Sequence, residues 1–184
     1  MAQPEVKEIR QIASGKYLTL KEIYFTDERG RSRVWESTGR VGTVGAVMII
    51  PRMIPSGDLI LVRQFRPPAG RYMIEFPAGL MEPGEAPEVT AMRELYEETG
   101  YEGTVDSVVP AAYNSPGMSG ETMTLVQMSI EAARYPVPPC NHQEDSENIE
   151  VFVVPVSDMK KFIADAEKNG DGIDSKIVVF TALL

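Results

Sequence analysis

The sequence predicts an α+β fold in which helices pack on the faces of a mixed β-sheet. Strand patterns fill most of the chain, one clear helix interrupts them, and two helical patterns close the sequence. Residues 44–50 and 59–65 are hydrophobic at nearly every position, which is typical of strands buried on both faces. The chain length suits one compact domain with a small addition, so we expect an N-terminal β region over residues 1–42 and a main domain over residues 43–184.

The N-terminal region is predicted to contain an antiparallel β-hairpin. Residues 16–25 are rich in β-branched and aromatic types, residues 27–30 (Asp-Glu-Arg-Gly) suit a turn, and residues 32–37 resume the alternation. The two strands of this hairpin carry the aromatic residues Tyr17 and Trp35.

The middle of the chain contains the clearest helix, predicted over residues 87–99. Pro87 suits the first helical position, and Glu88 suits the positive N-terminal end of the helix dipole. Gly100 suits the C′ position, where a left-handed conformation ends the helix. A short strand is expected before this helix, at residues 72–76.

More strands, a long connection and two helices are expected after this helix. The strands are predicted at residues 104–113, 122–130 and 150–156. Residues 134–148 form a Pro-rich, acidic connection, and a connection of that length inside a compact domain is usually functional or mobile. The helices are predicted at residues 158–168, with Ser157 as the N-cap, and at residues 174–184.

Composition and charge exclude several classes of function. The net charge of −9 argues against a nucleic-acid partner. No apolar run approaches the ~20 residues of a membrane helix, and the first residues lack a signal-peptide core, so a cytoplasmic protein is expected. The single cysteine, Cys140, excludes an internal disulfide. Cys140 has no visible base partner, and His142 is expected to be a solvated loop residue.

Three glutamates share one face of the predicted helix. Glu94, Glu97 and Glu98 are spaced i, i+3 and i+4, so their carboxylates repel one another near the negative end of the helix dipole. Arg93 neutralises only part of this charge. A hard divalent cation such as Mg²⁺ would turn the repulsion into attraction, whereas a solvated acidic face is the alternative interpretation.

The surroundings of the glutamates favour the metal hypothesis. The glycine-bounded loop at residues 79–85 lets backbone carbonyls approach the same cation, with Ala78 the best placed. The opposite face of the helix is expected to anchor it to the core through Val89, Met92 and Tyr96.

The segment GLMEPGEAPEVTAMRELYEETGY, residues 79–101, resembles the Nudix box, G-x5-E-x7-R-E-U-x-E-E-x-G-U, where U is a bulky aliphatic residue. The matching residues are Gly79, Glu85, Arg93, Glu94, Leu95, Glu97, Glu98 and Gly100. Only Tyr101, at the final bulky position, departs from the pattern. The resemblance to the Nudix hydrolase family implies an α/β/α sandwich and a loop–helix–loop that binds Mg²⁺ and hydrolyses a substituted nucleoside diphosphate.

The same resemblance assigns roles to residues of the box. The implied metal ligands are Glu94, Glu97, Glu98 and the carbonyl of Ala78. The implied structural residues are Gly79, Glu85, Arg93 and Gly100, of which the charged pair would orient the carboxylates. Mg²⁺ is the expected cofactor, with Mn²⁺ as a substitute.

Residues outside the box resemble the ADP-ribose and ADP-sugar pyrophosphatase branch. The resemblance rests on Pro116, on the QFRPP and IEFPAG sequences, and on the N-terminal hairpin. It implies a homodimer in which the hairpin is exchanged and its aromatic residues sandwich the adenine of a small-molecule nucleoside diphosphate sugar. The implied substrate-binding residues are Tyr17, Trp35, Glu36, Arg40, Arg66, Leu80, Ser115 and Met118.

Catalysis in that branch implies a glutamate outside the box that positions the attacking water. By position we expect Glu147, with Glu144 as the alternative and Glu97 as a further catalytic residue. The expected reaction is Mg²⁺-dependent hydrolysis of ADP-ribose or a related ADP-sugar to AMP and a sugar phosphate. The alternatives are a Nudix hydrolase of another nucleotide sugar, such as GDP-mannose, and a non-catalytic nucleotide-binding module.

Overall fold

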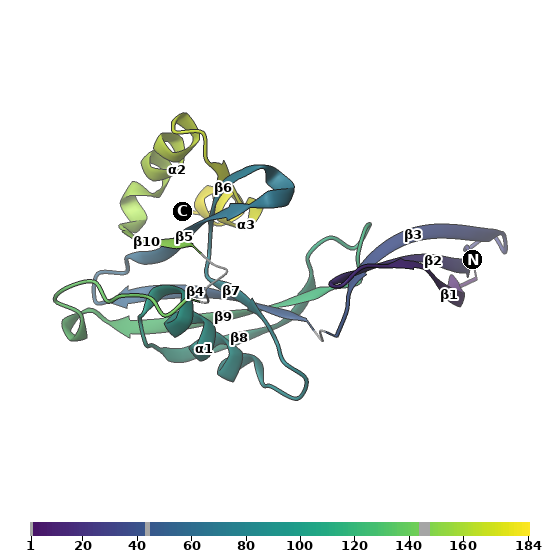
Figure 1. Cartoon of the computed structure of the whole chain (residues 1–184), viewed down its shortest axis with the longest axis horizontal. Coiled ribbons are helices and arrows are strands. Elements are labelled where there is room, and N and C mark those ends of the chain that lie inside the picture. Colours follow the sequence, from purple (N-terminus) through teal and green to yellow (C-terminus); the bar gives the residue numbers. More distant parts are fainter. Residues whose placement is uncertain (1, 43–44, 144–147) are drawn as a thin grey trace.

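The chain folds into two separate β-sheets, of which the larger carries the helices (Figure 1). The computed structural model describes residues 2–42, 45–143 and 148–184. The smaller sheet lies at one end of the molecule, and its three antiparallel strands are β1 (Glu5–Ser14), β2 (Leu18–Thr26) and β3 (Ser32–Arg40). Strands β2 and β3 form the predicted hairpin, in which Ile23 pairs with Trp35.

The larger sheet has eight strands and mixed pairing. Its main order is β11-β6-β5-β4-β9-β8, while β7 pairs with β4 and β10 pairs with β5. The strands are β4 (Ala46–Ile54), β5 (Leu59–Arg66), β6 (Arg71–Glu75), β7 (Ala78–Leu80), β8 (Thr104–Tyr113), β9 (Thr122–Glu131), β10 (Ile149–Val154) and β11 (Gly172–Ile173). Strands β4 and β9 are parallel, as are β6 and β11, and the other pairs are antiparallel.

Helices cover both faces of this sheet, which confirms the predicted fold class. Helix α1 (Pro87–Thr99) lies on one side, and α2 (Met159–Lys168) and α3 (Ser175–Ala182) lie on the other (Figure 1). In the described parts of the chain no helix is long and apolar enough to cross a membrane.

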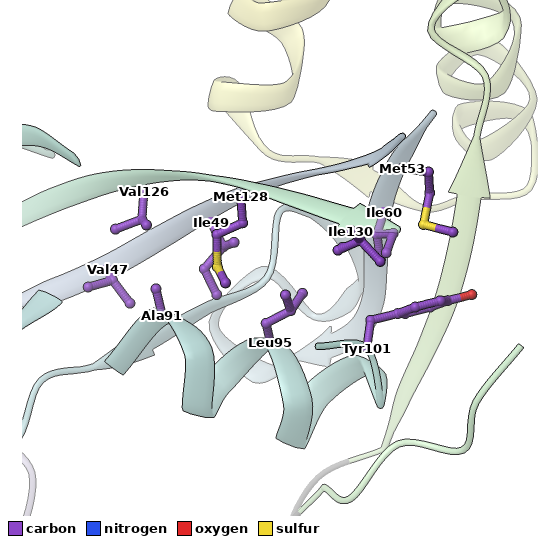
Figure 2. Packing of buried hydrophobic residues seen from close by; sticks show 10 residues of the cluster. All are labelled: Val47, Ile49, Met53, Ile60, Ala91, Leu95, Tyr101, Val126, Met128 and Ile130. Atoms are coloured by element: carbon purple, nitrogen blue, oxygen red, sulfur yellow. The ribbon is translucent and has the colours of Figure 1, made fainter. Parts of the chain in front are cut away.

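The core consists of two hydrophobic clusters, one on each face of the sheet. Val47 and Ile49 of β4 pack with Leu95 of α1 in the first cluster (Figure 2), whereas Met48 and Ile50 belong to the second, beside α2 and α3. Successive residues of a strand point to opposite faces, so β4 contributes to both clusters, as its uniformly apolar sequence predicted. Each fully buried side chain of this size contributes roughly 1.5–3 kcal/mol.

Some elements differ from the prediction. Strand β1 was not predicted, because it is exposed along its whole length and its many charged residues mask the strand pattern. Strands β7 and β11 are too short to leave a pattern and exist through pairing with β4 and β6. Ser157 is not an N-cap: it lies in a 3₁₀ turn (Val156–Asp158), and Asp158, which precedes α2, makes no side-chain capping bond.

The buried face of α1 also differs from the prediction. Val89, Met92 and Tyr96 are 50%, 45% and 40% exposed, so they do not anchor the helix to the core. The anchoring stripe instead contains Ala91 and Leu95, which are fully buried. Next to this stripe, Glu98 is buried and the Glu94 side chain is only 15% exposed, whereas that of Glu97 is 39% exposed.

The C-terminal end of α1 is held by the connection that follows β9. Gly100 adopts φ 74°, and its N–H donates to the Tyr96 carbonyl at 2.8 Å, as predicted for a C′ glycine. A Cβ at Gly100 would overlap the carbonyl oxygen of Cys140. One turn away, His142 donates its N–H to the Glu97 carbonyl at 2.8 Å and stacks its ring on Tyr96.

The close approach of the Cys140 carbonyl to Gly100 predicts that Gly100→Ala destabilises the protein more than a matched glycine variant. Gly170→Ala is the control, because Gly170 also has a positive φ, of 90°, but a Cβ added there would point into open space, with no contact inside 4 Å. We expect Gly170→Ala to cost about 1 kcal/mol of unfolding free energy and Gly100→Ala a further ~1–3 kcal/mol from overpacking. Denaturant unfolding measures both, and equal losses would show that the Cys140 contact contributes nothing.

Candidate active site

A pocket of about 560 Å³ opens where the N-terminal ends of β4 and β9 meet β7 and α1. The predicted site residues that line it are Arg40, Arg66, Ala78, Gly79, Leu80, Arg93, Glu94, Glu97 and Glu98. These residues come from separate elements, and the fold brings carboxylates and guanidinium groups to one cavity.

Arg93 is the charged centre of the α1 wall of this pocket. Its Nη1 donates to the carboxylates of Glu94 at 2.7 Å and Glu97 at 3.1 Å. Its Nη2 donates to the Glu85 carboxylate at 3.2 Å and to the Leu80 carbonyl at 3.3 Å. These carboxylates raise the pKa of Arg93, so one guanidinium ties the loop to the helix and offsets the repulsion between the acids.

Glu85 is held as a carboxylate by the same contacts. Hydrogen bonds from Arg93, and then from the N–H of Glu82, lower the pKa of Glu85 to about 2. Glu85 therefore stays ionised near neutral pH and links the Arg93 guanidinium to the backbone at the start of the loop.

Close packing of α1 on β7 positions two of the glutamates. A Cβ at Gly79 would overlap the carboxylate of Glu94, so only glycine lets this side chain lie against the strand. Glu98 is 3% exposed, and its Oε2 accepts a hydrogen bond from the N–H of Ala78 at 3.2 Å. The helix and the strand thus meet at two of the three acids that the resemblance assigns to metal binding.

The donor chemistry of the pocket fits a hard divalent cation. Carboxylate and carbonyl oxygens are the ligands that such a cation prefers, and the positive guanidinium of Arg93 already lies against Glu94 and Glu97. Within the described residues, no group of three or more acidic, histidine or cysteine side chains is arranged to hold a metal ion. Arg93 and the Ala78 amide engage the carboxylates instead, so their assignment as ligands stays a prediction.

Arg66 also lines the pocket, and the sequence analysis missed the residues that surround it. Glu75 of β6 accepts from Nε and Nη2 of Arg66, with the shortest N–O distance at 2.7 Å. Gln64, two residues before Arg66 on β5, also lines the pocket and donates to Glu75 at 3.2 Å. The period of two along β5 places Gln64 and Arg66 on one face, but only the register with β6 brings Glu75 to them.

Arg40 also has a partner that the sequence analysis missed. Its Nε donates to the Glu121 carboxylate at 2.6 Å, and both residues line the pocket. This ion pair joins the end of β3 to the start of β9, so the small sheet contributes directly to the cavity of its own chain.

The remaining N-terminal residues lie outside the pocket lining. Trp35 is exposed, and its Nε1 donates to the Gly117 carbonyl at 2.9 Å. The neighbouring Met118 carbonyl accepts from the N–H of Thr38 at 2.9 Å, so β3 is tied to the loop that contains Ser115. Tyr17 and Glu36, two further substrate-binding residues predicted in the hairpin, are exposed and do not line the cavity.

The predicted water-positioning glutamates, Glu144 and Glu147, lie outside the described residues. The described residues on either side are joined by hydrogen bonds. Gln143 accepts from the N–H of Ile149 at 2.6 Å, and Asn141 donates to the carbonyl of Ile149 at 3.0 Å. Cys140 is an exposed free thiol.

Comparison with known proteins agrees with this geometry. The NUDIX domain matches residues 42–174. The chain is 40% identical to an ADP-sugar pyrophosphatase of Mus musculus over 158 residues, which cover 80% of this chain and 72% of the relative. It is 31% identical to an ADP-ribose pyrophosphatase of Saccharomyces cerevisiae over 185 residues, which cover 94% and 79% of the two chains.

A solved structure supports the fold independently. The crystal structure of an ADP compounds hydrolase superposes with a TM-score of 0.74 at 23% identity, covering 100% of this chain and 92% of the other. The family match spans most of the chain and includes the whole segment from Gly79 to Gly100, with its glutamates on the pocket wall. The chain therefore belongs to the Nudix family.

Proposed function

We propose that the protein is a Nudix hydrolase that cleaves the pyrophosphate bond of ADP-ribose or a related ADP-sugar. The observation that carries the proposal is one pocket that is lined both by Glu94, Glu97 and Glu98 and by Arg40 and Arg66. A diphosphate bridge needs cationic groups to bind its oxygens and an acidic cluster to hold a divalent metal beside it. The ADP-ribose and ADP-sugar pyrophosphatases among the relatives favour this substrate class.

The metal would be held by Glu94, Glu97, Glu98 and the Ala78 carbonyl. Mg²⁺, or Mn²⁺ in its place, would neutralise charge developing on the diphosphate and lower the pKa of a bound water when present.

The chain's own residues supply the other parts of the mechanism. Arg66 would donate to a phosphate oxygen, because an arginine fork matches phosphate geometry. Glu147 would hold the attacking water in line and accept its proton, with Glu144 as the alternative for that role and Glu97 as a further catalytic residue. Leu80, which lines the same pocket, and the loop of Ser115 and Met118 would contact the ribose end of the substrate.

A homodimer would complete the adenine site. Val6, Ile9 and Ile12 of β1 are exposed apolar residues on a sheet that stands apart from the core. A second copy that covers this sheet would bury them and bring Tyr17 and Trp35 to an adenine ring. In this proposal, residues 1–42 form the exchanged region and residues 43–184 form the Nudix domain.

Product analysis tests the reaction directly. With Mg²⁺ we expect ADP-ribose to give AMP and ribose 5-phosphate, faster than GDP-mannose or NADH is cleaved in parallel, and EDTA to stop the reaction. Glu98→Gln keeps the shape of a buried side chain but removes its charge, so we expect activity to fall at least ~100-fold at an unchanged melting temperature.

Other outcomes would contradict particular parts of this proposal. An unchanged kcat for Glu98→Gln would remove the metal assignment. Preferred cleavage of GDP-mannose would support the other nucleotide-sugar specificity, and binding without cleavage would support a non-catalytic module.

Loss of the Trp35 ring is expected to weaken binding of ADP-ribose. We predict that Trp35→Ala raises KM about 5- to 100-fold, because stacking of one base on an aromatic ring contributes ~1–3 kcal/mol. Trp35→Phe separates two roles: it keeps a stacking ring but loses the N–H that donates to Gly117. A KM raised equally in both variants would assign the effect to the hydrogen bond instead of to stacking.

Mixed subunits test whether Trp35 acts across a dimer. We would combine Trp35→Ala subunits with Glu98→Gln subunits and assay them at low ADP-ribose concentration. Recovered activity is expected if each site takes Trp35 from the partner, because one site of the mixed dimer is then intact. No recovery would place Trp35 and Glu98 in a site formed by one chain.

A further inference from the structure

The contact between Arg66 and Glu75 restricts the orientation of the Arg66 guanidinium. Both Nε and Nη2 of Arg66 donate to the Glu75 carboxylate, at N–O distances of 2.7–3.2 Å. The Arg66 side chain is 43% exposed, whereas that of Glu75 is only 14% exposed. The carboxylate therefore lies beneath the guanidinium, on the side away from solvent.

Two strands fix this arrangement. Glu75 pairs with Val62 on β5, and the side chains of Val62, Gln64 and Arg66 point to the same face as that of Glu75. Gln64 adds a third hydrogen bond to the carboxylate, at 3.2 Å. Glu75 is thus held by both side chains that β5 presents to the pocket.

By its charge alone, a carboxylate beside a phosphate-binding arginine would weaken the binding of phosphate. Glu75 reduces the positive potential that Arg66 offers to an anion. It also restricts a long side chain before the substrate arrives, so that less conformational freedom is lost on binding. The bidentate contact takes one edge of the planar guanidinium and so sets the direction of the whole group.

We propose that Glu75 is a positioning residue for Arg66: it holds the guanidinium toward the pocket, in the orientation that binds the diphosphate. This inference rests on the proposed function, in which Arg66 binds a phosphate oxygen. It assigns to Glu75 an effect on substrate binding rather than on the chemical step.

Steady-state kinetics of Glu75→Gln test this role. We expect KM for ADP-ribose to rise about 10-fold while kcat changes by less than about 3-fold, because the amide is a much weaker acceptor for the guanidinium. The double variant Arg66→Ala/Glu75→Gln should bind no more weakly than Arg66→Ala, because Glu75 acts only through Arg66. Multiplied effects in the double variant, or an unchanged KM for Glu75→Gln, would overturn the proposal.

A matched ion pair away from the pocket serves as the control. Glu102 accepts from Arg134 at 2.6 Å, and neither residue lines the cavity. Glu102→Gln should leave KM and kcat unchanged. A comparable rise in KM in this variant would attribute the effect to general loss of surface charge and overturn the assignment to Glu75.

Direct binding separates failure of this inference from failure of the proposed function. Calorimetry with ADP needs no turnover, so it applies even if the wild-type protein cleaves no ADP-sugar. About 10-fold weaker binding of ADP by Glu75→Gln than by wild type supports the positioning role. Equal affinity overturns it alone, and no binding of ADP by the wild type overturns both proposals.

Discussion

The interaction on which the candidate site depends is the contact of one guanidinium with three carboxylates. Arg93 reaches Glu94 and Glu97 on its own helix and Glu85 on the preceding loop. Without a cation at this place, the acids on α1 would repel one another at the negative end of the helix dipole. Arg93 therefore allows an acidic face to pack toward the sheet, with Gly79 giving Glu94 the room that it needs.

The local features of the fold could be predicted from the sequence because they depend on neighbours along the chain. The bounds of α1 follow from Pro87 at its start and Gly100 after its end, and the structure has the helix at the predicted residues. The apolar strand β4 is buried on both faces, as its pattern indicated. The spacing of the glutamates also placed them correctly on one side of the helix. The prediction of which residues face the core was wrong. Which helix residues face the core depends on the side from which the sheet packs against the helix. The apolar character of Val89 and Tyr96 does not reveal that side, and both residues are exposed.

The partners of the site residues could not be predicted, because they are set by contacts between distant segments. The register of β5 and β6 brings Glu75 to Arg66. The bond between Arg40 and Glu121 forms where the end of the small sheet meets the start of β9 in the large sheet. The bond from Trp35 to Gly117 likewise joins residues that are far apart in the sequence. A sequence motif can identify candidate site residues, but the neighbours that orient them are determined by how the strands pair in the folded protein.

The pairing of Arg93 with the acids around it has a consequence for the stability of the protein without metal. An acidic site that relied on a bound ion for its stability would be folded only while that ion was present. Here Arg93 supplies a positive charge from within the chain, which offsets part of the repulsion among these acids. In the proposed metal-dependent enzyme, loss of the ion would therefore stop turnover without unfolding the protein.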